Sequence, residues 1–271
     1  MITYGQDKYI RQSIKGILMQ KVGFDIELII ADDCSTDKTQ EIVQDIIRNH
    51  PNGQWIKYTR HSQNKGMLDN LIWALGQCRG KYIALCEGDD YWIDQNKLQH
   101  QVAILEANKN CSFCFHRALR IFDTSRPYEI YPDLENNIID SEQLFGLYTI
   151  PMASVVFRSK INFWFPANHI QPDFLLLCKL MSNGDAYFLP EVMSVYRKHA
   201  NGISYNNQSY NYLKRRVECL HIEVKSTEFT PDVRRQIKRI FKSHTKQLIS
   251  KYSDQFSFVS LLKYRYWLLS I

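Results

Sequence analysis

The chain has 271 residues, of which 45% are hydrophobic and 23% charged, and its formal net charge is +6. This is an ordinary globular composition without a low-complexity tract or an internal repeat, which excludes fibrous and repeat architectures. No stretch reaches the roughly 18 apolar residues that a membrane-spanning helix needs, and no signal peptide opens the sequence. The seven cysteines are an odd number scattered through apolar runs, which indicates reduced thiols and a cytoplasmic protein.

Charge is unevenly distributed along the chain. Residues 1–206 carry 21 basic and 23 acidic side chains, a net charge of −2, whereas residues 207–271 carry 13 basic and 5 acidic side chains, a net charge of +8. This split predicts a body that holds most of the acidic residues and a basic appendage that follows it.

Apolar periodicity predicts alternating helices and strands over residues 7–108. Ile10, Ile14 and Ile17 recur at helical spacing within residues 7–20, and residues 26–31 form a nearly continuous apolar strand. The same reasoning predicts a helix capped by Ser35 or Thr36, a strand over 55–59, a helix over 66–77, an apolar strand that starts at Lys81, and a helix over 95–108. Strands that alternate with helices of this length favour an α/β fold with a mostly parallel, doubly wound, Rossmann-like sheet.

Beyond residue 110 the pattern changes. Strands are predicted over residues 111–122, 154–158 and 186–189, with a helix over 173–182. From about residue 207 the chain becomes helical and basic. We therefore expect a body over residues 1–205 and a basic helical extension over residues 206–271.

The most informative motif is the acidic turn after the strand that starts at Lys81. Glu87, Asp89 and Asp90 place three carboxylates within four residues, and these would repel one another unless a cation lay between them. Carboxylate oxygens at this density suit Mg²⁺ or Mn²⁺, which typically also binds a substrate phosphate. The carboxyl end of a strand is where ligands bind in open α/β sheets. A solvated acidic turn is the alternative.

Two other polar turns follow predicted strands in the first half of the chain. Asp33, in the run Asp32-Asp33-Cys34-Ser35-Thr36-Asp37, could accept a hydrogen bond from a base N–H or a ribose hydroxyl, and helix capping is the alternative role of this run. Lys65, in Asn64-Lys65-Gly66, precedes a helix start, where backbone N–H groups and a lysine can meet phosphate. Such turns are common, so this second motif is weak alone.

Two further candidates lie in the second half. Asp173 opens an otherwise apolar segment, where helix capping is the default role. Arg197 and His199, in Tyr196-Arg197-Lys198-His199, could hold a pyrophosphate or help to complete a metal shell. A solvated basic turn is the alternative for that segment.

Together these motifs resemble those of family 2 glycosyltransferases, which have the GT-A fold, and in particular the type that builds bacterial surface polysaccharides. The resemblance rests on an ordered set near the family's usual spacing, and it covers residues 1–205, the expected catalytic domain. The matching segments are residues 27–39, Asn64-Lys65-Gly66, Glu87-Gly88-Asp89-Asp90-Tyr91-Trp92, Asp173, and Tyr196-Arg197-Lys198-His199 with Gly202.

The resemblance implies a role for most of the matching residues. Asp173 would be the catalytic base that activates the acceptor. The donor would be bound by Thr3 and Tyr4 in the first nucleotide-binding loop, Asp33 at the base, Asp89 near the ribose, Asp90 as the metal ligand, and His199 near the metal and the diphosphate. Lys65 and Arg197 fit the phosphate contacts considered above.

The implied reaction is an inverting, metal-dependent transfer of a sugar from a nucleotide donor, for which we expect a UDP-sugar with Mg²⁺ or Mn²⁺. It requires that the leaving-group charge is neutralised, that the acceptor hydroxyl is deprotonated, and that both reactants are held in line. The expected acceptor is a glycan or a polyprenyl-linked glycan in cell-surface polysaccharide synthesis.

Two features depart from the family pattern. Met1-Ile2 stands directly against Thr3-Tyr4, so about half a dozen residues of the family's central first strand are absent, which would expose backbone groups that need partners. Gly5 stands where the family usually has Asn. A second hypothesis is therefore a truncated homologue that binds nucleotide or glycan without turnover. A third, a sugar-1-phosphate nucleotidyltransferase, lacks support because that family's Gly-rich N-terminal loop is absent.

The basic segment from residue 207 carries apolar residues at helical spacing, among them Leu213, Val217 and Leu220. Its helices either pack on the body or rest a basic surface on anionic lipid, at the inner face of the cell membrane. Trp267 and the neighbouring tyrosines could anchor such an interface. No nucleic-acid-binding motif accompanies the charge, so a nucleic-acid partner is not expected.

Overall fold

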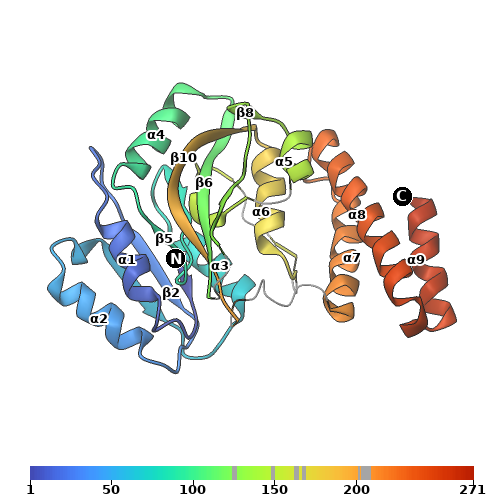
Figure 1. Cartoon of the computed structure of the whole chain (residues 1–271), viewed down its shortest axis with the longest axis horizontal. Coiled ribbons are helices and arrows are strands. Elements are labelled where there is room, and N and C mark those ends of the chain that lie inside the picture. Colours follow the sequence, from blue (N-terminus) through green and yellow to red (C-terminus); the bar gives the residue numbers. More distant parts are fainter. Residues whose placement is uncertain (124–126, 148–149, 162–164, 167–168, 201, 203–208) are drawn as a thin grey trace.

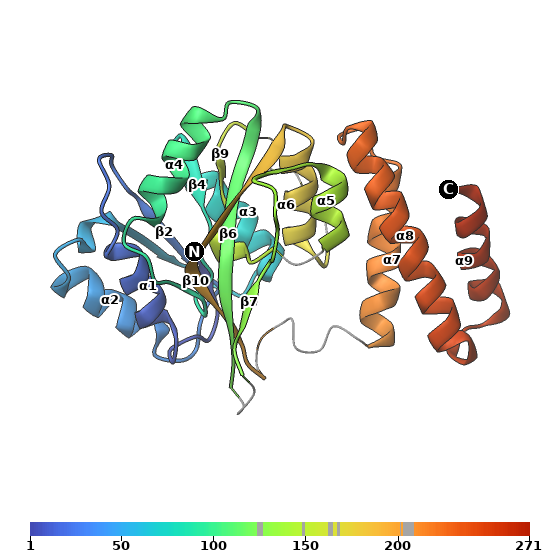
Figure 2. The same ribbon diagram turned by 45° about the horizontal axis from the view of Figure 1, so that its top comes forward.

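The computed structural model places two β-sheets between layers of helices and adds three further helices at the C-terminal end (Figure 1). It describes residues 1–123, 127–147, 150–161, 165–166, 169–200, 202 and 209–271. The end of the chain lies far from the first sheet, and the last three helices form a group at the opposite side of the molecule from α1 and α2 (Figure 2).

The first sheet has three strands in the order β1-β2-β3, and all of its pairings are parallel. Its central strand is buried along its whole length, as its continuous apolar run predicted. The elements of this part are β1 (Ile2–Thr3), α1 (Ile10–Leu18), β2 (Leu28–Asp32), α2 (Thr39–Asn49), η1 (Gly53–Trp55), β3 (Ile56–Arg60) and α3 (Met67–Gln77).

The second sheet is mixed, with the order β4-β9-β6-β10-β5. Its two long strands, β6 and β10, run parallel, while the shorter strands pair antiparallel with their neighbours. The mostly parallel arrangement expected from the sequence therefore holds for the first sheet and for β6 with β10, whereas the short strands β5, β7, β8 and β9 run antiparallel to these two long strands. The strands are β4 (Tyr82–Ala84), β5 (Tyr91–Trp92), β6 (Cys111–Phe122), β7 (Glu129–Tyr131), β8 (Ile138–Ile139), β9 (Val156–Arg158) and β10 (Asp185–Lys198).

Strand β10 is much longer than the segment 186–189 that the sequence predicted. Its register with β6 shifts between Leu189 and Val192, around Pro190, and pairing then resumes as far as Lys198. Proline cannot donate to the ladder, and an irregularity at such a point lets the strand continue. As a result, the segment that contains Arg197 is the end of a strand, where the sequence had predicted only a motif.

Helices cover both sides of the sheets, and the buried apolar residues form two clusters. Strand β6 contributes to both, because Cys114 faces the cluster of α1, α2 and α4, whereas Phe113 and Phe115 face the cluster of α3, α5 and α6. This alternation follows the two-residue period of a strand. The remaining helices of the body are α4 (Lys97–Ala107), α5 (Ser141–Leu147), η2 (Met152–Ser154) and α6 (Pro172–Met181).

The C-terminal extension comprises α7 (Tyr210–Val224), α8 (Pro231–Tyr252), η4 (Ser253–Gln255) and α9 (Phe258–Ser270). Its apolar faces belong to the same cluster as α6, with Val217, Ile237 and Phe241 fully buried. The helices therefore pack on the body. The boundary at residues 205 and 206 remains a prediction, since this shared core crosses it.

Strand β1 is present but has only two residues. Ile2 and Thr3 pair with Ala31 and Asp32, and the Met1 amino group donates to the Ile29 carbonyl at 2.8 Å. Burial lowers the pKa of this amino group. Gly5, the second departure from the family pattern, has a left-handed φ of +64°, a conformation that Asn also tolerates better than most residues.

A fully buried lysine generates a prediction about stability. Lys97 donates to Gln101 Oε1 at 2.7 Å and lies 4.0 Å from the centre of the Trp92 ring, and burial lowers its pKa to about 7. The unfolded chain therefore binds more protons between pH 7 and the ordinary lysine pKa of 10.5. The contribution of Lys97 to the free energy of unfolding should therefore rise over that pH range by an amount on the order of 3–5 kcal/mol.

Lys97→Met should remove this pH dependence, which urea unfolding at pH 7 and pH 10 would measure. The matched control is Lys21→Met at an exposed lysine, which should keep the slope of the unchanged protein. The prediction is wrong if Lys97→Met and Lys21→Met show the same slope.

Candidate active site

Hydrogen bonds join the loop after β1 to the loop after β2. Gly5 N donates to Ser35 Oγ at 2.9 Å, and Asp7 N donates to Asp37 Oδ2 at 2.9 Å. Asp33 N also donates to the Thr3 carbonyl at 2.9 Å. Thr3 is buried, while Tyr4 is 54% exposed at the surface of this joined pair of loops. The two segments that the sequence assigned to nucleotide binding therefore form one wall.

Asp33 links this wall to the start of α3. Its Oδ1 accepts from Lys65 N at 2.7 Å, and its Oδ2 accepts from Gly66 N at 2.9 Å. The structure thus brings together Asp33 and Lys65, which the sequence had proposed separately. Each carboxylate oxygen can accept a further hydrogen bond, so these contacts leave acceptor capacity for a base or ribose. The Lys65 residue is exposed.

The acidic turn packs closely against the first loop. Gly88 N donates to the Ile2 carbonyl at 3.1 Å, and Ser13 Oγ donates to the Gly88 carbonyl at 2.8 Å. A Cβ at Gly88 would lie 2.7 Å from Thr3 Oγ1, which is too close for a side chain. Glycine at this position therefore allows Asp89 and Asp90 to lie beside the wall formed by the two loops.

Asp89 and Asp90 are held by the end of β10. Arg197 N donates to Asp90 Oδ1 at 2.9 Å, and His199 Nε2 lies 3.1 Å from Asp89 Oδ2. The Arg197 guanidinium donates to the Asp89 carbonyl and to Gln12 Oε1. The two aspartates differ, because Asp90 is buried whereas the Asp89 side chain is 19% exposed.

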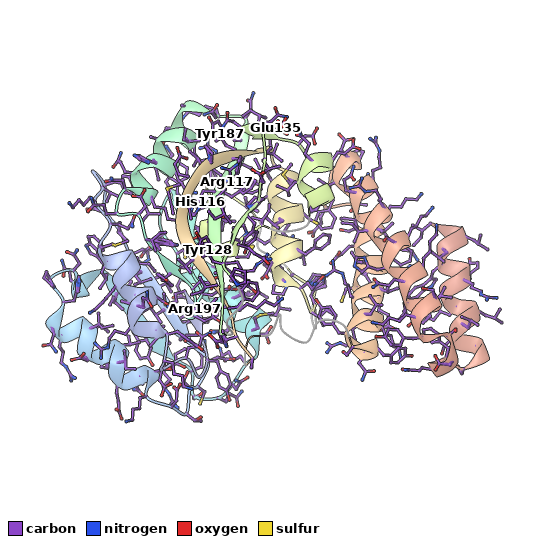
Figure 3. The ribbon with its side chains drawn as sticks, in the orientation of Figure 1. His116, Arg117, Tyr128, Glu135, Tyr187 and Arg197 are labelled. Carbon is purple, nitrogen blue, oxygen red and sulfur yellow. The ribbon has the colours of Figure 1, made fainter. Side chains whose placement is uncertain are left out.

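Aromatic rings fix the orientation of Arg197. Its guanidinium lies 4.3 Å from the centre of the Tyr91 ring and 5.1 Å from that of Tyr9. Tyr9 in turn lies 4.8 Å from the His199 ring. Figure 3 shows Arg197 near the end of β10 that is remote from Tyr187. The side chain is thus directed by its surroundings toward the acidic turn.

Helix α1 supplies contacts that the sequence analysis missed. Tyr9 and Gln12 contact Arg197, and the fully buried Ser13 holds Gly88. A polar residue at position 13, between the apolar positions 10 and 14, was the available signal, because a buried hydroxyl needs a partner. Tyr9 and Gln12 gave no comparable signal, since their partner, Arg197, lies far from them in the sequence.

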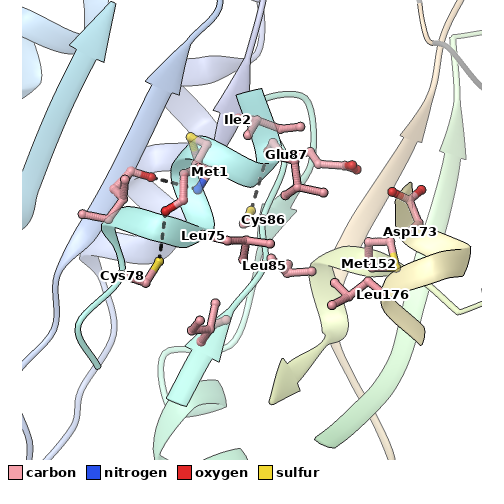
Figure 4. A pocket seen from close by; sticks show the side chains of 15 residues that line it. Met1, Ile2, Leu75, Cys78, Leu85, Cys86, Glu87, Met152, Asp173 and Leu176 are labelled. Atoms are coloured by element: carbon pink, nitrogen blue, oxygen red, sulfur yellow. Dashed lines mark hydrogen bonds between the residues drawn. The ribbon is translucent and has the colours of Figure 1, made fainter. Parts of the chain in front are cut away.

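Asp173 lies in the first turn of α6 and, with Glu87, lines an apolar pocket. The pocket has a cavity volume of about 50 Å³. In Figure 4, Glu87 and Asp173 occupy one side of this pocket, while Met1 and Cys78 lie at the other. Burial raises the pKa of Asp173, and burial followed by the charge of Asp173 raises the pKa of Glu87. A carboxylate with a raised pKa is suited to accept a proton near neutral pH.

Residues 1–201 match the sequence profile of the Glycosyl transferase family 2. The chain belongs to that family. An uncharacterised protein of Mycobacterium tuberculosis is 36% identical over 204 residues, which are 74% of this chain and 58% of that protein. The putative teichuronic acid biosynthesis glycosyltransferase TuaG of Bacillus subtilis is 24% identical over 225 residues, covering 81% of this chain and 87% of TuaG. The chain thus spans little more than half the length of the mycobacterial relative.

Solved structures confirm the GT-A fold for this family 2 member. Staphylococcus aureus TarS 1–349 in complex with UDP-GlcNAc aligns with a TM-score of 0.72 and 18% identity, over 98% of this chain and 78% of that one. The mannosyltransferase PcManGT from Pyrobaculum calidifontis, in complex with GDP-Man and Mn²⁺, aligns with a TM-score of 0.55 and 13% identity, over 99% of this chain and 81% of that one. The alignments cover the C-terminal helices as well as the body.

The acidic turn of this family 2 chain offers an incomplete set of metal ligands. Within the described ranges, no group of three or more His, Cys, Asp or Glu side chains is arranged to hold a metal ion. Burial and the charge of Asp89 raise the pKa of Asp90, so a cation beside the two carboxylates would relieve their repulsion. These donors fit a divalent ion whose shell is completed by substrate phosphates, the usual arrangement for Mg²⁺.

This arrangement predicts opposite effects of Asp90→Asn with and without metal. Without metal, the substitution should raise the melting temperature, because the amide oxygen still accepts from Arg197 N but the side chain no longer repels Asp89. Each 1 kcal/mol gained in the free energy of unfolding corresponds to a rise of about 2–4 °C. The same substitution should abolish the stabilisation by Mn²⁺ with UDP. Thermal unfolding measures both, with Asp254→Asn at an exposed site as the control. Stabilisation by Mn²⁺ and UDP that survives in Asp90→Asn would contradict the assignment.

Proposed function

We propose that this chain transfers a sugar from a UDP-sugar donor to a glycan acceptor, with inversion at the anomeric carbon. One observation carries the proposal. The two joined loops, the acidic turn and the end of β10 meet at one site, and Asp173 lines the pocket beside it. These parts come from elements far apart in the sequence, and they match two of the three requirements of the reaction, a site for the diphosphate charge and a base for the acceptor hydroxyl.

The donor side is assigned to residues whose contacts are already directed toward it. Asp33 would accept from the base or ribose, since its position is fixed by Lys65 N and Gly66 N. The Lys65 and Arg197 side chains would contact the diphosphate. Asp89 and Asp90 would hold Mg²⁺ or Mn²⁺, with His199 beside Asp89; when bound, the ion would neutralise charge on the leaving diphosphate. TarS in complex with UDP-GlcNAc and PcManGT with GDP-Man and Mn²⁺ support a nucleotide-sugar and a metal.

Asp173 is assigned as the general base. It would accept the proton of the acceptor hydroxyl while that oxygen attacks the anomeric carbon from the side opposite the diphosphate, which gives inversion. Burial raises the pKa of Asp173. A higher pKa makes its carboxylate a better proton acceptor near neutral pH.

The proposed acceptor is a glycan, free or polyprenyl-linked, of a cell-surface polysaccharide. Support comes from the names of relatives, TuaG in teichuronic acid biosynthesis and the poly(ribitol-phosphate) β-N-acetylglucosaminyltransferase TarS, which is 30% identical over 105 residues. The alternative is a homologue that binds nucleotide without turnover. Release of UDP from UDP-sugars distinguishes the two.

Asp173→Asn is expected to lower turnover by about 10²–10⁴-fold while leaving UDP affinity within a few-fold of the unchanged protein. UDP release from a panel that includes UDP-GlcNAc and UDP-glucose would measure turnover, and calorimetry with Mn²⁺ would measure binding. Asp185→Asn, at the remote start of β10, is the control. Equal turnover in Asp173→Asn and the unchanged protein would remove Asp173 from the mechanism, and no turnover in the unchanged protein would favour the non-catalytic alternative.

We also propose that α9 rests on an anionic lipid surface. Four apolar residues at spacings of three, four and three lie exposed along one face: Val259 (75%), Leu262 (48%), Tyr266 (67%) and Leu269 (88%). The segment they belong to carries a net charge of +8 over residues 207–271, which complements anionic headgroups. No helix of the described chain is long and apolar enough to cross a bilayer. In this proposal the contact is peripheral, at the inner face of the cell membrane.

This surface predicts binding to phosphatidylglycerol vesicles and little binding to pure phosphatidylcholine vesicles in a sedimentation assay. Replacing Leu262 and Leu269 together with Ser should abolish the binding. Ser270→Ala, at the same end of α9, should not change it. Failure to sediment with anionic vesicles, or a dimer in light scattering that the double variant disrupts, would assign the apolar face to something other than lipid.

A further inference from the structure

Helix α7 contacts the short segment that precedes Asp173. Tyr212, Arg216 and Glu223 are separated by four and seven residues, so they lie along one face of the helix. All three reach residues 169–171, the segment immediately before α6. The face is polar within an otherwise apolar interface, which sets it apart from ordinary helix packing.

The first contact joins His169 to Glu223. Both side chains are almost completely buried, and His169 Nε2 is hydrogen-bonded to Glu223 Oε1. Gln171 N donates to His169 Nδ1 at 3.2 Å, so Nδ1 is an acceptor and carries no proton. The ring nitrogen Nε2 therefore donates to the Glu223 carboxylate. This arrangement fixes the orientation of the ring and the path of the backbone from residue 169 to residue 171.

The second contact holds Gln171, the residue that caps α6. The Arg216 guanidinium donates to Gln171 Oε1, and Gln171 Nε2 donates to the Tyr212 hydroxyl. Both ends of the amide are therefore bonded to α7. Arg216 is itself buried and lies 5.8 Å from the centre of the Phe174 ring, so it contacts α6 on both sides of Asp173.

We propose that Arg216 is a positioning residue for Asp173, acting through Gln171, and that Glu223 performs the same task through His169. Asp173 follows Gln171 by two residues, at the start of α6, so the backbone that carries the base is fixed from α7. This inference rests on the proposed role of Asp173 as the base. It deepens that role, because it places part of the catalytic apparatus in the C-terminal extension.

A residue that positions the base and a residue that only packs differ in which properties their substitution changes: turnover alone, or stability, donor binding and turnover together. Proximity and orientation dominate catalysis by a base, and a small displacement of the base lowers turnover without affecting a donor site built on other elements. Loss of packing alone would instead lower stability and affect donor binding and turnover together.

The test compares Arg216→Met with Arg216→Lys in the full chain, with Arg215→Met as the control at an exposed neighbour on α7. Arg216→Met should lower kcat for UDP release from UDP-GlcNAc or another accepted UDP-sugar by about 10–100-fold. The Kd for UDP with Mn²⁺ should stay within about 2-fold of the unchanged protein, because the donor site is not touched. Arg216→Lys should recover much of kcat because it retains a cationic donor, and Arg215→Met should change nothing.

Gln171→Ala provides a second route that does not alter a buried charge. It should lower kcat to a similar extent as Arg216→Met, and the double variant should be no slower than the slower single variant, because both remove the same connection. Multiplicative losses in the double variant, or a parallel fall in UDP affinity and kcat, would overturn the inference.

Asp173→Asn, measured in parallel, separates failure of this inference from failure of the proposed function. Loss of turnover in Asp173→Asn with full turnover in Arg216→Met and Gln171→Ala would overturn the positioning role alone. Full turnover in Asp173→Asn, or none in the unchanged protein with any UDP-sugar, would overturn both.

Discussion

The buried carboxylate of Asp90 is the constraint around which the donor side of this protein is arranged. A buried carboxylate is costly unless it is hydrogen-bonded, and Arg197 N supplies that bond at 2.9 Å. The Arg197 side chain extends the connection to Asp89 and to Gln12 on α1. Each hydrogen bond to a charged group contributes on the order of 1.5–3 kcal/mol. The acidic turn, α1 and the end of β10 therefore depend on one another for their positions.

The motifs at this junction could be recognised in the sequence, but the contacts between them could not. The apolar runs predicted β2, α2 and α3, because a buried strand is almost continuously apolar and a packed helix carries apolar residues at helical spacing. The acidic turn and the basic motif at Arg197 were both recognised as motifs. Their hydrogen bond joins residues 107 positions apart, and no local pattern encodes such a pairing. The strand predicted over residues 186–189 also continues beyond its expected end, because the register shift around Pro190 carries β10 onward to Lys198.

The same limit applies to the sheet and to the buried polar residues. Alternating helices and strands predicted helices on both faces, but the antiparallel pairings of β5, β7, β8 and β9 depend on contacts with β6, β10 and β4 that their few residues cannot specify. Lys97 would be expected at the surface from its residue type, yet it is fully buried beside Trp92. Asp33 was predicted as a ligand for a nucleotide, whereas its contacts with Lys65 N and Gly66 N were not. The sequence thus indicates which groups are polar and functional, and the tertiary structure determines what each one contacts.

The two sides of the candidate site rest on different cores. The acidic turn packs beside the apolar cluster of α1, α2 and α4, which includes Cys86 and Trp92. Asp173 belongs to α6, whose Leu176 lies in the cluster that also contains Val217 of α7 and Phe241 of α8. Close-packed interiors transmit displacements, so a change in the extension moves α6 more directly than it moves the acidic turn. The C-terminal helices are therefore part of the structure that carries the candidate base, and separating them from the body would expose the buried face of α6 while leaving the core beneath the donor side covered.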